Sequence, residues 1–347
     1  MTTFKRLHPV FANGALRRAG LLAITMGALV LCTQAAALVL YVGPEGRADA
    51  SGRSPDSAIG DIQRALDKGI AQRPKGETLE LRVLPGTYTG QRLTLKSSEA
   101  DGGDIAIVRD EGIQRPVFDG NGLAATWLTV EADKRPFRKL RVTGLEIRRY
   151  ATAISFNGSR DIDERSVSDV VIRNNIFRSI GQTEVTQKAP STAAVRLVNA
   201  DRVQIVNNRF AQISNRQKCG LIHALYVAHG STDNLIEDNN FEDSCGDAVR
   251  FRDGSSGNKV VRNAFVDAWA DAPISDWYCD ASSRKDCTKK TPECPSFDNE
   301  IADNRIEARK AKTPERLKAH GEDTTSLCPR PAGNRAAAAA RSRFLVR

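Results

Sequence analysis

The sequence predicts an all-β protein built as a solenoid, in which short parallel strands stack coil upon coil. Two interleaved series of similar segments carry this prediction. The first comprises VIRNNIF, QIVNNRF, LIEDNNF, KVVRNAF and EIADNRI, with an asparagine at the same place in each: Asn175, Asn208, Asn239, Asn263 and Asn304. The second comprises AISFNG, AVRLVN, ALYVAH and AVRFRD, which begin at Ala153, Ala194, Ala224 and Ala248. Each repeat therefore contains at least two short strands.

The spacing of the asparagines favours coils of variable length. Successive asparagines lie 33, 31, 24 and 41 residues apart, which is too irregular for a helical solenoid but normal where loops are inserted into a minimal coil. Strands this short, apolar at alternate positions and without hairpin Asn-Gly turns between them, cannot bury their apolar faces alone. Parallel stacking buries those faces and lets the asparagines hydrogen-bond along the stack as a ladder.

The first 37 residues have the anatomy of a secretory signal peptide. Four basic residues precede an apolar run that closes on three alanines at 35–37, so we expect cleavage after about Ala37. A retained transmembrane anchor over residues 19–37 is the alternative. Cleavage would leave a secreted or periplasmic protein with no stable membrane span.

The segment after the signal predicts a strand, a loop, an amphipathic helix over 57–72 and a second strand. The apolar helix positions fall on one face: Ile59, Ile62, Leu66 and Ile70. Asp56 or Ser57 is the expected N-cap. We expect this helix to cap the N-terminal end of the stack, where an uncovered coil would expose its edge to aggregation.

Several motifs together resemble the right-handed parallel β-helix family typified by pectate lyases. They are YVGPEG at 41–46, VLPGTYTG at 83–90, PVFDGNG at 116–122 and the asparagine repeats. The resemblance covers roughly residues 39–307. It implies a right-handed, single-stranded parallel β-helix with an N-terminal capping α-helix. In this family the same coils serve lyases, hydrolases, epimerases and proteins without chemistry.

The chain divides by composition into a signal (1–37), a β-helix domain (38–307) and a basic, Ala-rich tail (308–347) whose end we expect to be disordered. The formal charge of +9 arises from the two ends. Of the 51 basic residues, four lie in the signal and ten in the tail, leaving 37 basic against 39 acidic groups in the domain. The domain therefore offers no electrostatic footprint for nucleic acid, and we expect a monomer.

Six cysteines follow the signal: Cys219, Cys245, Cys279, Cys287, Cys294 and Cys328. An even number in an exported chain predicts disulfides in an oxidising compartment. The last four include no C-x2-C pair, which disfavours zinc. Cys219 and Cys245 lie at similar offsets before strands of adjacent coils, so we expect these two to be bonded.

The second series of strands predicts an outward stripe of unusual side chains. Alternation directs one set of side chains into the core: Ile154, Phe156, Val195, Leu197, Leu225, Val227, Val249 and Phe251. Arg196, Tyr226 and Arg250 then share one outward column, and Arg252 lies in the next. Parallel strands are about 4.8 Å apart, so residues in one column are neighbours in space.

Two His/Asp pairs are expected to flank this stripe. His223 and Asp247 each precede the strand by one residue on adjacent coils, and His229 and Asp253 each occupy its sixth position. The alternative interpretation is that all these side chains form an ordinary polar surface without a function. The tryptophans near the stripe, Trp269 and Trp277, are equally suited to stacking on sugar rings and to packing in the core.

Arginine, tyrosine, histidine and aspartate on one wall suit an acidic sugar. Arg250 would grip a uronate carboxylate through its planar fork, assisted by Arg196, Arg252 and the two His/Asp pairs. Neutralising the carboxylate acidifies the C5 proton, which Tyr226 or His223 would remove while protonating the leaving oxygen. That reaction is β-elimination by a polysaccharide lyase.

Other outcomes stay open for this wall. Return of the proton to the other face would give epimerisation, whereas a glycoside hydrolase needs two carboxylates at a defined separation. A non-catalytic carbohydrate-binding or envelope-structural protein is the alternative from another class. The family implies calcium held by several carboxylates and an arginine base, but Asp247 and Asp253 form no evident cluster, so we expect no cofactor or metal.

Overall fold

The computed structural model describes residues 37–100, 103–112, 114–123, 125–159, 166–181, 191–215, 218–268, 272–279, 293–308, 315–316 and 341–346. All of the expected signal (1–37) except its last residue therefore lies outside the described residues. Within the described part, the chain forms two parallel sheets and one α-helix, α1 (Ile62–Gln72). None of the helices described there is long and apolar enough to cross a membrane.

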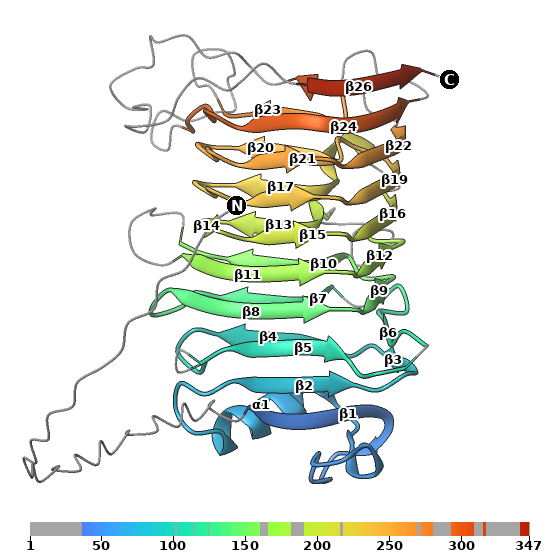
Figure 1. The fold of residues 1–347 in the computed structure, drawn as a ribbon, viewed down its shortest axis with the longest axis vertical. Helices are drawn as coiled ribbons and strands as arrows, with labels where there is room; N and C mark the ends of the chain where they lie inside the picture. The colour runs from blue at the N-terminus through green and yellow to red at the C-terminus, as the bar shows by residue number, and fades with distance from the viewer. Residues whose placement is uncertain are drawn as a thin grey trace, which may run out of the picture. The chain divides into compact units, whose positions relative to one another are not determined.

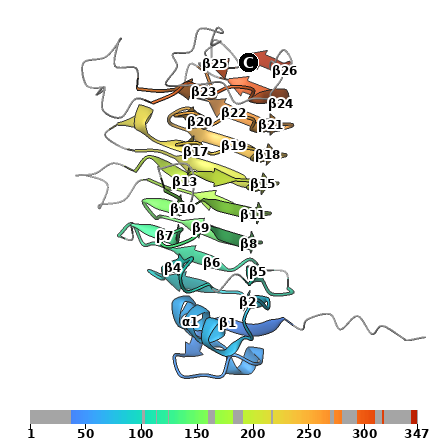
Figure 2. The same ribbon diagram turned by 90° about the vertical axis from the view of Figure 1, so that its left-hand side faces the viewer.

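The smaller sheet has eight strands among the described residues. It stacks β4 (Leu93–Lys96), β7 (Thr126–Glu131), β10 (Thr152–Asn157), β13 (Ala193–Val198), β17 (His223–Ala228), β20 (Val249–Arg252), β23 (Ile274–Trp277) and β25 (Glu315–Arg316). Figure 2 shows β4 to β23 rising one above another. We call it the eight-stranded sheet.

The larger sheet has two limbs. The first contains β1 (Leu38–Arg47), β2 (Leu79–Val83), β5 (Ile105–Arg109), β8 (Phe137–Thr143), β11 (Val167–Arg173), β14 (Ala200–Asp201), β15 (Gln204–Val206), β18 (Leu235–Glu237) and β21 (Lys259–Val261). The second contains β3 (Thr87–Thr89), β6 (Val117–Asp119), β9 (Glu146–Arg148), β12 (Ile176–Arg178), β16 (Arg209–Ile213), β19 (Asn240–Ser244) and β22 (Ala264–Ala268). β24 (Glu300–Ala308) pairs with both limbs and with β26 (Arg341–Val346).

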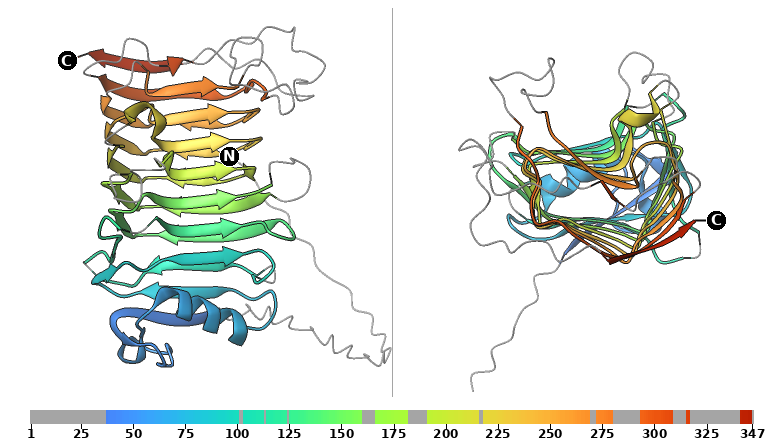
Figure 3. Two further views of the ribbon diagram at one scale, coloured as in Figure 1. Left: turned by 180° about the vertical axis from the view of Figure 1, so that it is seen from behind. Right: turned by 90° about the horizontal axis from the view of Figure 1, so that it is seen from above.

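From β2 to β23, each coil contributes strands to three sides. In a typical coil, β17 leads to β18 and then β19, and each of these pairs in parallel with the corresponding strand of the next coil. Seen from above, the strands of successive coils superpose along these sides (Figure 3). The predicted solenoid of stacked parallel strands is confirmed.

The interior is apolar because alternate side chains of every side point inward. All eight side chains assigned to the core from the second series are fully buried, and the register aligns Ile154, Val195, Leu225 and Val249 in one column. On the second limb, four phenylalanines stack with ring centroids 4.8–5.0 Å apart: Phe177, Phe210, Phe241 and Phe265. Such aromatic contacts add to the stability gained by burial.

The predicted asparagine ladder is present. Asn175, Asn208, Asn239, Asn263 and Asn304 are all buried, and each side-chain oxygen from Asn208 onward accepts a hydrogen bond of 2.9 Å from the backbone N–H of the preceding asparagine. A second, unpredicted ladder joins Asn234, Asn258 and Asn299 in the same way. The ladders satisfy backbone groups at turns, where no strand partner exists.

The N-terminal helix is shorter than predicted. α1 begins at Ile62, and its N-cap is Asp61, whose carboxylate accepts from the N–H of Arg64 at 2.8 Å. The predicted caps Asp56 and Ser57 lie instead in a short 3-10 turn, η1 (Pro55–Ser57). Gly60 explains the difference: it packs so closely on Gly46 that a Cβ at Gly60 would lie 2.1 Å from the Gly46 carbonyl oxygen. Figure 1 shows α1 at the first coil.

The C-terminal segment differs from the expected tail at two places. β24 continues to Ala308, and β26 adds a parallel strand to β24 within the stretch that we expected to be disordered. A second short strand, β25, pairs with β23. The stack therefore gains backbone partners beyond residue 307.

Candidate functional site

The predicted outward stripe lies on the eight-stranded sheet. Register pairs Arg196 with Tyr226 and Tyr226 with Arg250, and the next outward column contains Arg252, which pairs with Trp277 of β23. Ser275 of β23 continues the first column beyond Arg250. We call this group the polar wall, defined as Arg196, His223, Tyr226, Asp247, Arg250, Arg252 and Ser275. The three arginines are partly exposed, whereas the other four side chains are buried.

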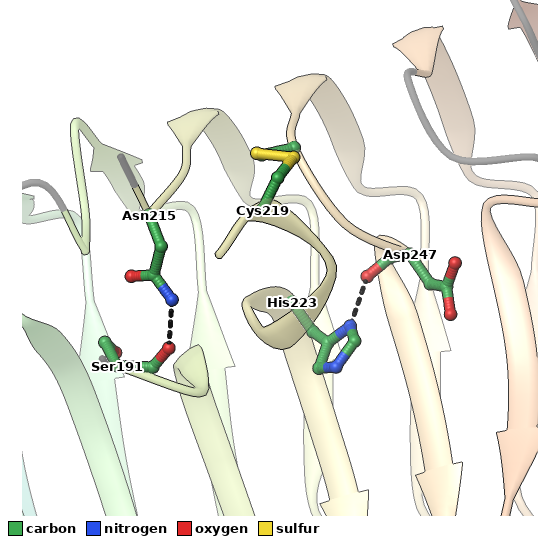
Figure 4. Close-up of a disulfide and its surroundings, with 6 residues drawn as sticks. Ser191, Asn215, Cys219, His223 and Asp247 are labelled. Atoms are coloured by element: carbon green, nitrogen blue, oxygen red, sulfur yellow. Dashed lines mark hydrogen bonds between the residues drawn. A yellow bond between two sulfur atoms is a disulfide. The ribbon is translucent and has the colours of Figure 1, made fainter. Parts of the chain in front are cut away.

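His223 is a neutral imidazole held in one orientation. Its Nδ1 lies 2.9 Å from the backbone carbonyl oxygen of Asp247, as Figure 4 shows. A carbonyl only accepts, so Nδ1 carries the proton and Nε2 the lone pair. Burial, together with the charge of Arg250, lowers the pKa of His223 to about 4. The ring also stacks on Tyr226, with centroids 5.8 Å apart.

The carboxylate of Asp247 binds Arg250 rather than His223. Arg250 donates to Asp247 Oδ2 from both Nε and Nη2, and Ser275 Oγ donates to the same oxygen at 2.5 Å. Burial alone would raise the pKa of Asp247, but Arg250 and Ser275 stabilise the charged form and bring the pKa below its usual value. Arg250 is therefore fixed in place by a carboxylate that is itself buried.

Tyr226 and Arg252 form a second linked pair. Arg252 Nη1 donates to the Tyr226 hydroxyl at 2.8 Å. The same guanidinium binds both carboxylate oxygens of Glu293, from Nε at 2.8 and 3.0 Å, and lies 4.4 Å above the ring of Trp277. Within the described residues the Tyr226 hydroxyl proton has no acceptor, so this phenol is free to act as a donor.

The second His/Asp pair makes a direct side-chain contact. His229 Nδ1 lies 2.7 Å from Asp253 Oδ2, and the backbone N–H of Cys294 donates to Asp253 Oδ1 at 3.0 Å. Burial would raise the pKa of Asp253, but the contacts with His229 and Cys294 lower it. The pair sits just beyond the ends of β17 and β20, so it borders the polar wall.

His229, Asp253 and Glu293 bring ligand atoms within 4.8 Å of one another. A cation there would have to displace Arg252, whose guanidinium holds both oxygens of Glu293. Calcium fits the wall poorly for a second reason. Asp247 and Asp253 lie at opposite ends of β20, about 20 Å apart at roughly 3.3 Å per residue, so they cannot share one ion.

The predicted disulfide between Cys219 and Cys245 is present, with Cα atoms 5.1 Å apart. It ties η3 (Cys219–Leu221), the turn before His223, to the segment before Asp247 (Figure 4). Cys279 and Cys294 each take part in a disulfide as well. Cys287 and Cys328 lie outside the described residues.

The structure brings most of the predicted site residues together, but through other contacts than expected. His223 was expected to contact the Asp247 side chain, but it bonds to the Asp247 main-chain carbonyl. The two arginines expected to bind the ligand, Arg250 and Arg252, are bonded to the carboxylates of Asp247 and Glu293. Ser275 was not among the predicted residues, but its place next to Arg250 follows from the register once β23 is recognised as the next strand of the sheet. Glu293 follows a cysteine-rich loop without periodicity, so no signal in the sequence could place it on the wall.

The pKa of His223 predicts a pH-dependent stability. An unfolded imidazole titrates near pH 6.5 and the folded one near 4, so the unfolded state binds more protons between these values. Wild-type protein should therefore lose stability as the pH falls through this window. Between pH 7 and 4.5 it should lose about 2 kcal/mol more than His223→Asn, measured by urea unfolding. Equal losses in both proteins would contradict the buried neutral imidazole.

Comparisons with known proteins agree with this fold. A family model described as "Right handed beta helix region" matches residues 138–273, so this part of the chain is a right-handed β-helix. No curated protein matches the chain.

Three solved structures illustrate the similarity. Pectate lyase Pel9A is 12% identical, with 89% of this chain and 78% of that chain covered and a TM-score of 0.43. The Escherichia coli protein YbhC is 12% identical, with 89% and 84% covered and a TM-score of 0.48. A rhamnogalacturonan lyase is 12% identical, with 78% and 68% covered and a TM-score of 0.41. Likeness at this level of identity concerns the fold alone.

Proposed function

We propose that the polar wall binds an acidic, uronate-containing polysaccharide and cleaves it by β-elimination. One observation carries the proposal. The Tyr226 hydroxyl proton has no acceptor among the described residues, and the Tyr226 ring stacks on the neutral imidazole of His223. Two arginines fixed by internal carboxylates lie beside them. A proton donor, a proton acceptor and fixed positive charge are the three requirements of the reaction.

His223 and Tyr226 divide the two proton transfers between them. His223 Nε2 takes the C5 proton of the uronate, the C4–O bond breaks as a C4–C5 double bond forms, and Tyr226 gives its proton to the leaving oxygen. Arg252 Nη1, at 2.8 Å, stabilises the resulting phenolate. Transfer from imidazolium to phenolate then restores both groups. A bound uronate carboxylate favours the charged imidazole, which offsets the low pKa of the free protein.

Arg250 supplies the positive charge at the uronate. Its Nε and Nη2 are used by Asp247 and Ser275, and Nη1 has no acceptor in the part of the chain that the structure describes. A guanidinium held in this way can present Nη1 to the substrate carboxylate without reorganising. Such fixed donors stabilise charge that develops in a transition state better than mobile ones.

The face next to the wall supports a polymeric ligand. A cleft of about 690 Å³ opens on the same sheet and is lined in part by Thr94, Thr129 and Arg92. Thr129 lies in the column of Tyr226, three coils away, or about 14 Å at 4.8 Å per coil. A chain of several sugars would reach from the wall into this cleft.

Export to an oxidising compartment belongs to the same proposal. The Cys219–Cys245 disulfide supports it, because disulfides persist in secreted and periplasmic proteins and are rare elsewhere. Large acidic polysaccharides are extracellular or envelope polymers, so an exported enzyme would meet its substrate.

The test is an elimination assay with the purified full chain on polygalacturonate, alginate and chondroitin sulfate. Cleavage should generate the ultraviolet absorbance of a conjugated, unsaturated uronate on at least one polymer. New reducing ends without this absorbance would show hydrolysis and overturn the proposal, as would the absence of both signals on all three polymers.

A non-catalytic binding protein is the second candidate. The observation that favours it is that Arg250 and Arg252 are already bonded to Asp247 and Glu293, as in a stable polar surface. Retention of the protein on immobilised polymer without any product absorbance would favour this candidate.

A further inference from the structure

A groove of about 620 Å³ lies away from the polar wall, at the corner where the first limb of the larger sheet turns into the second. In Figure 1 this is the corner between β8 and β9 and between β11 and β12. We call it the corner groove. Its polar lining includes three arginines, five asparagines and one aspartate. Arg209 and Asp238 are paired with Glu242 and Arg262, and Asn175 and Asn208 belong to the buried ladder. The other arginines and asparagines at the groove are Arg109, Arg115, Asn174, Asn207 and Asn240.

The two arginines are placed in the groove by the backbone around them. Arg109 ends β5 and lies over Gly144, where a Cβ would come within 2.9 Å of the Arg109 Cβ and where φ is +82°. Only glycine permits both this approach and this conformation without strain. Arg115 crosses the corner and donates from Nη1 to the backbone carbonyl of Asn174.

Neither arginine donates a hydrogen bond to a carboxylate among the described residues. Burial and the charge of Arg109 lower the pKa of Arg115, only partly offset by Glu146. The contrast with the neighbouring surface is clear, because Arg148 and Arg149 both bind the buried carboxylate of Asp119, at 2.8 and 2.6 Å. Two like charges gathered without a carboxylate partner favour an anionic ligand.

The asparagines add hydrogen-bonding groups suited to hydroxyls. Asn207 Nδ2 donates to Asn174 Oδ1 at 2.7 Å, which leaves the Asn174 amide N–H groups as donors. Asn240 donates to Glu242 at 2.5 Å, while its own Oδ1 is shielded from solvent and accepts no hydrogen bond among the described residues. Buried acceptors normally have a hydrogen-bond donor, so Asn240 Oδ1 is available to accept a hydrogen bond from a ligand.

We propose that the corner groove is a second binding site for an acidic saccharide, separate from the polar wall. Arg109 and Arg115 would hold a carboxylate of the saccharide, and the asparagine amides would bind its hydroxyls. The combination favours a sugar acid over an inorganic anion, which would engage the arginines alone. The site would retain the polymer on the protein whether or not the wall cleaves it.

The test is calorimetric titration of the full chain with oligogalacturonate at fixed ionic strength. Arg109→Gln should weaken binding at one class of site about tenfold, since hydrogen bonds to charged groups are the strong ones, and Arg109→Glu should abolish that class. Arg141→Gln is the matched control, because Arg141 is an exposed arginine of β8 that does not line the groove.

The outcomes separate this proposal from that of the wall. Loss of one class in Arg109→Glu, with elimination activity unchanged or absent in both proteins, supports the groove. Equal binding by wild type and Arg109→Glu overturns it, as does an equal loss in Arg141→Gln. Inorganic phosphate and dextran sulfate, a polymer with sulfate groups but no carboxylates, are titrated in parallel. Binding of phosphate alone, or of dextran sulfate but not oligogalacturonate, would also overturn the assignment to a sugar carboxylate.

Discussion

Tyr226→Phe should reduce cleavage of the acidic polymer by about 10²- to 10⁴-fold, the range typical of a lost general acid. The substitution keeps the ring and its stacking on His223 but removes the proton that the leaving oxygen needs. Stability should change by only about 1 kcal/mol, because the variant loses one hydrogen bond and Arg252 keeps Glu293 as its partner.

Turnover and melting temperature are measured together on the most active polymer. Tyr41→Phe, in β1 of the first coil and away from the wall, is the control and should retain wild-type turnover. If Tyr226→Phe also retains it on a substrate that the wild type cleaves, Tyr226 is not the acid. Arg250→Ala is less informative, since it would remove the guanidinium that neutralises the buried carboxylate of Asp247 and so confound stability with catalysis.

Asn239→Ala should lower the free energy of unfolding by about 3 kcal/mol or more. Asn239 Oδ1 accepts from the Asn208 N–H at 2.9 Å, and its Nδ2 donates to the Ile205 carbonyl at 2.7 Å. Alanine leaves the buried Asn208 N–H without this acceptor, which costs about 1–3 kcal/mol, and also removes the hydrogen bond to the Ile205 carbonyl, worth about 1 kcal/mol.

Urea unfolding measures the loss. Asn157→Ala is the matched control: Asn157 faces outward from β10, is only partly buried and accepts one hydrogen bond, from Ser155. It should cost less than about 1 kcal/mol. Similar losses in the two variants would mean that the ladder contributes no more than an ordinary polar side chain.

The repetitive features were predictable because each is repeated in several coils. The ladder from Asn175 to Asn304 and the inward columns follow from spacing and alternation alone, and so does the approach of Tyr226 to Arg250. The start of α1 was not predictable in this way. It depends on the close packing of Gly60 on Gly46, a single contact between distant segments.

The sequence predicted most of the side chains that make up the wall, but not which partners they bind. Alternation places Arg250 and Arg252 outward, yet it cannot tell whether a substrate or a neighbour neutralises them. That depends on Asp247 turning its carboxylate from His223 toward Arg250, and on Glu293 approaching from outside the periodic coils. Rotamer choice and loop path leave no periodic trace in a sequence.

The unequal spacing of the asparagines shows that the inserted loops differ in length from coil to coil, whereas the stacked strands keep their register. The 24-residue step from Asn239 to Asn263 is close to a bare coil, whereas the 41-residue step to Asn304 carries extra chain and brings Glu293 onto Arg252. Because insertions leave the inner wall unchanged, length variation becomes a means of altering surface chemistry without redesigning the interior. A frame of this kind can gain or lose reactive side chains one loop at a time.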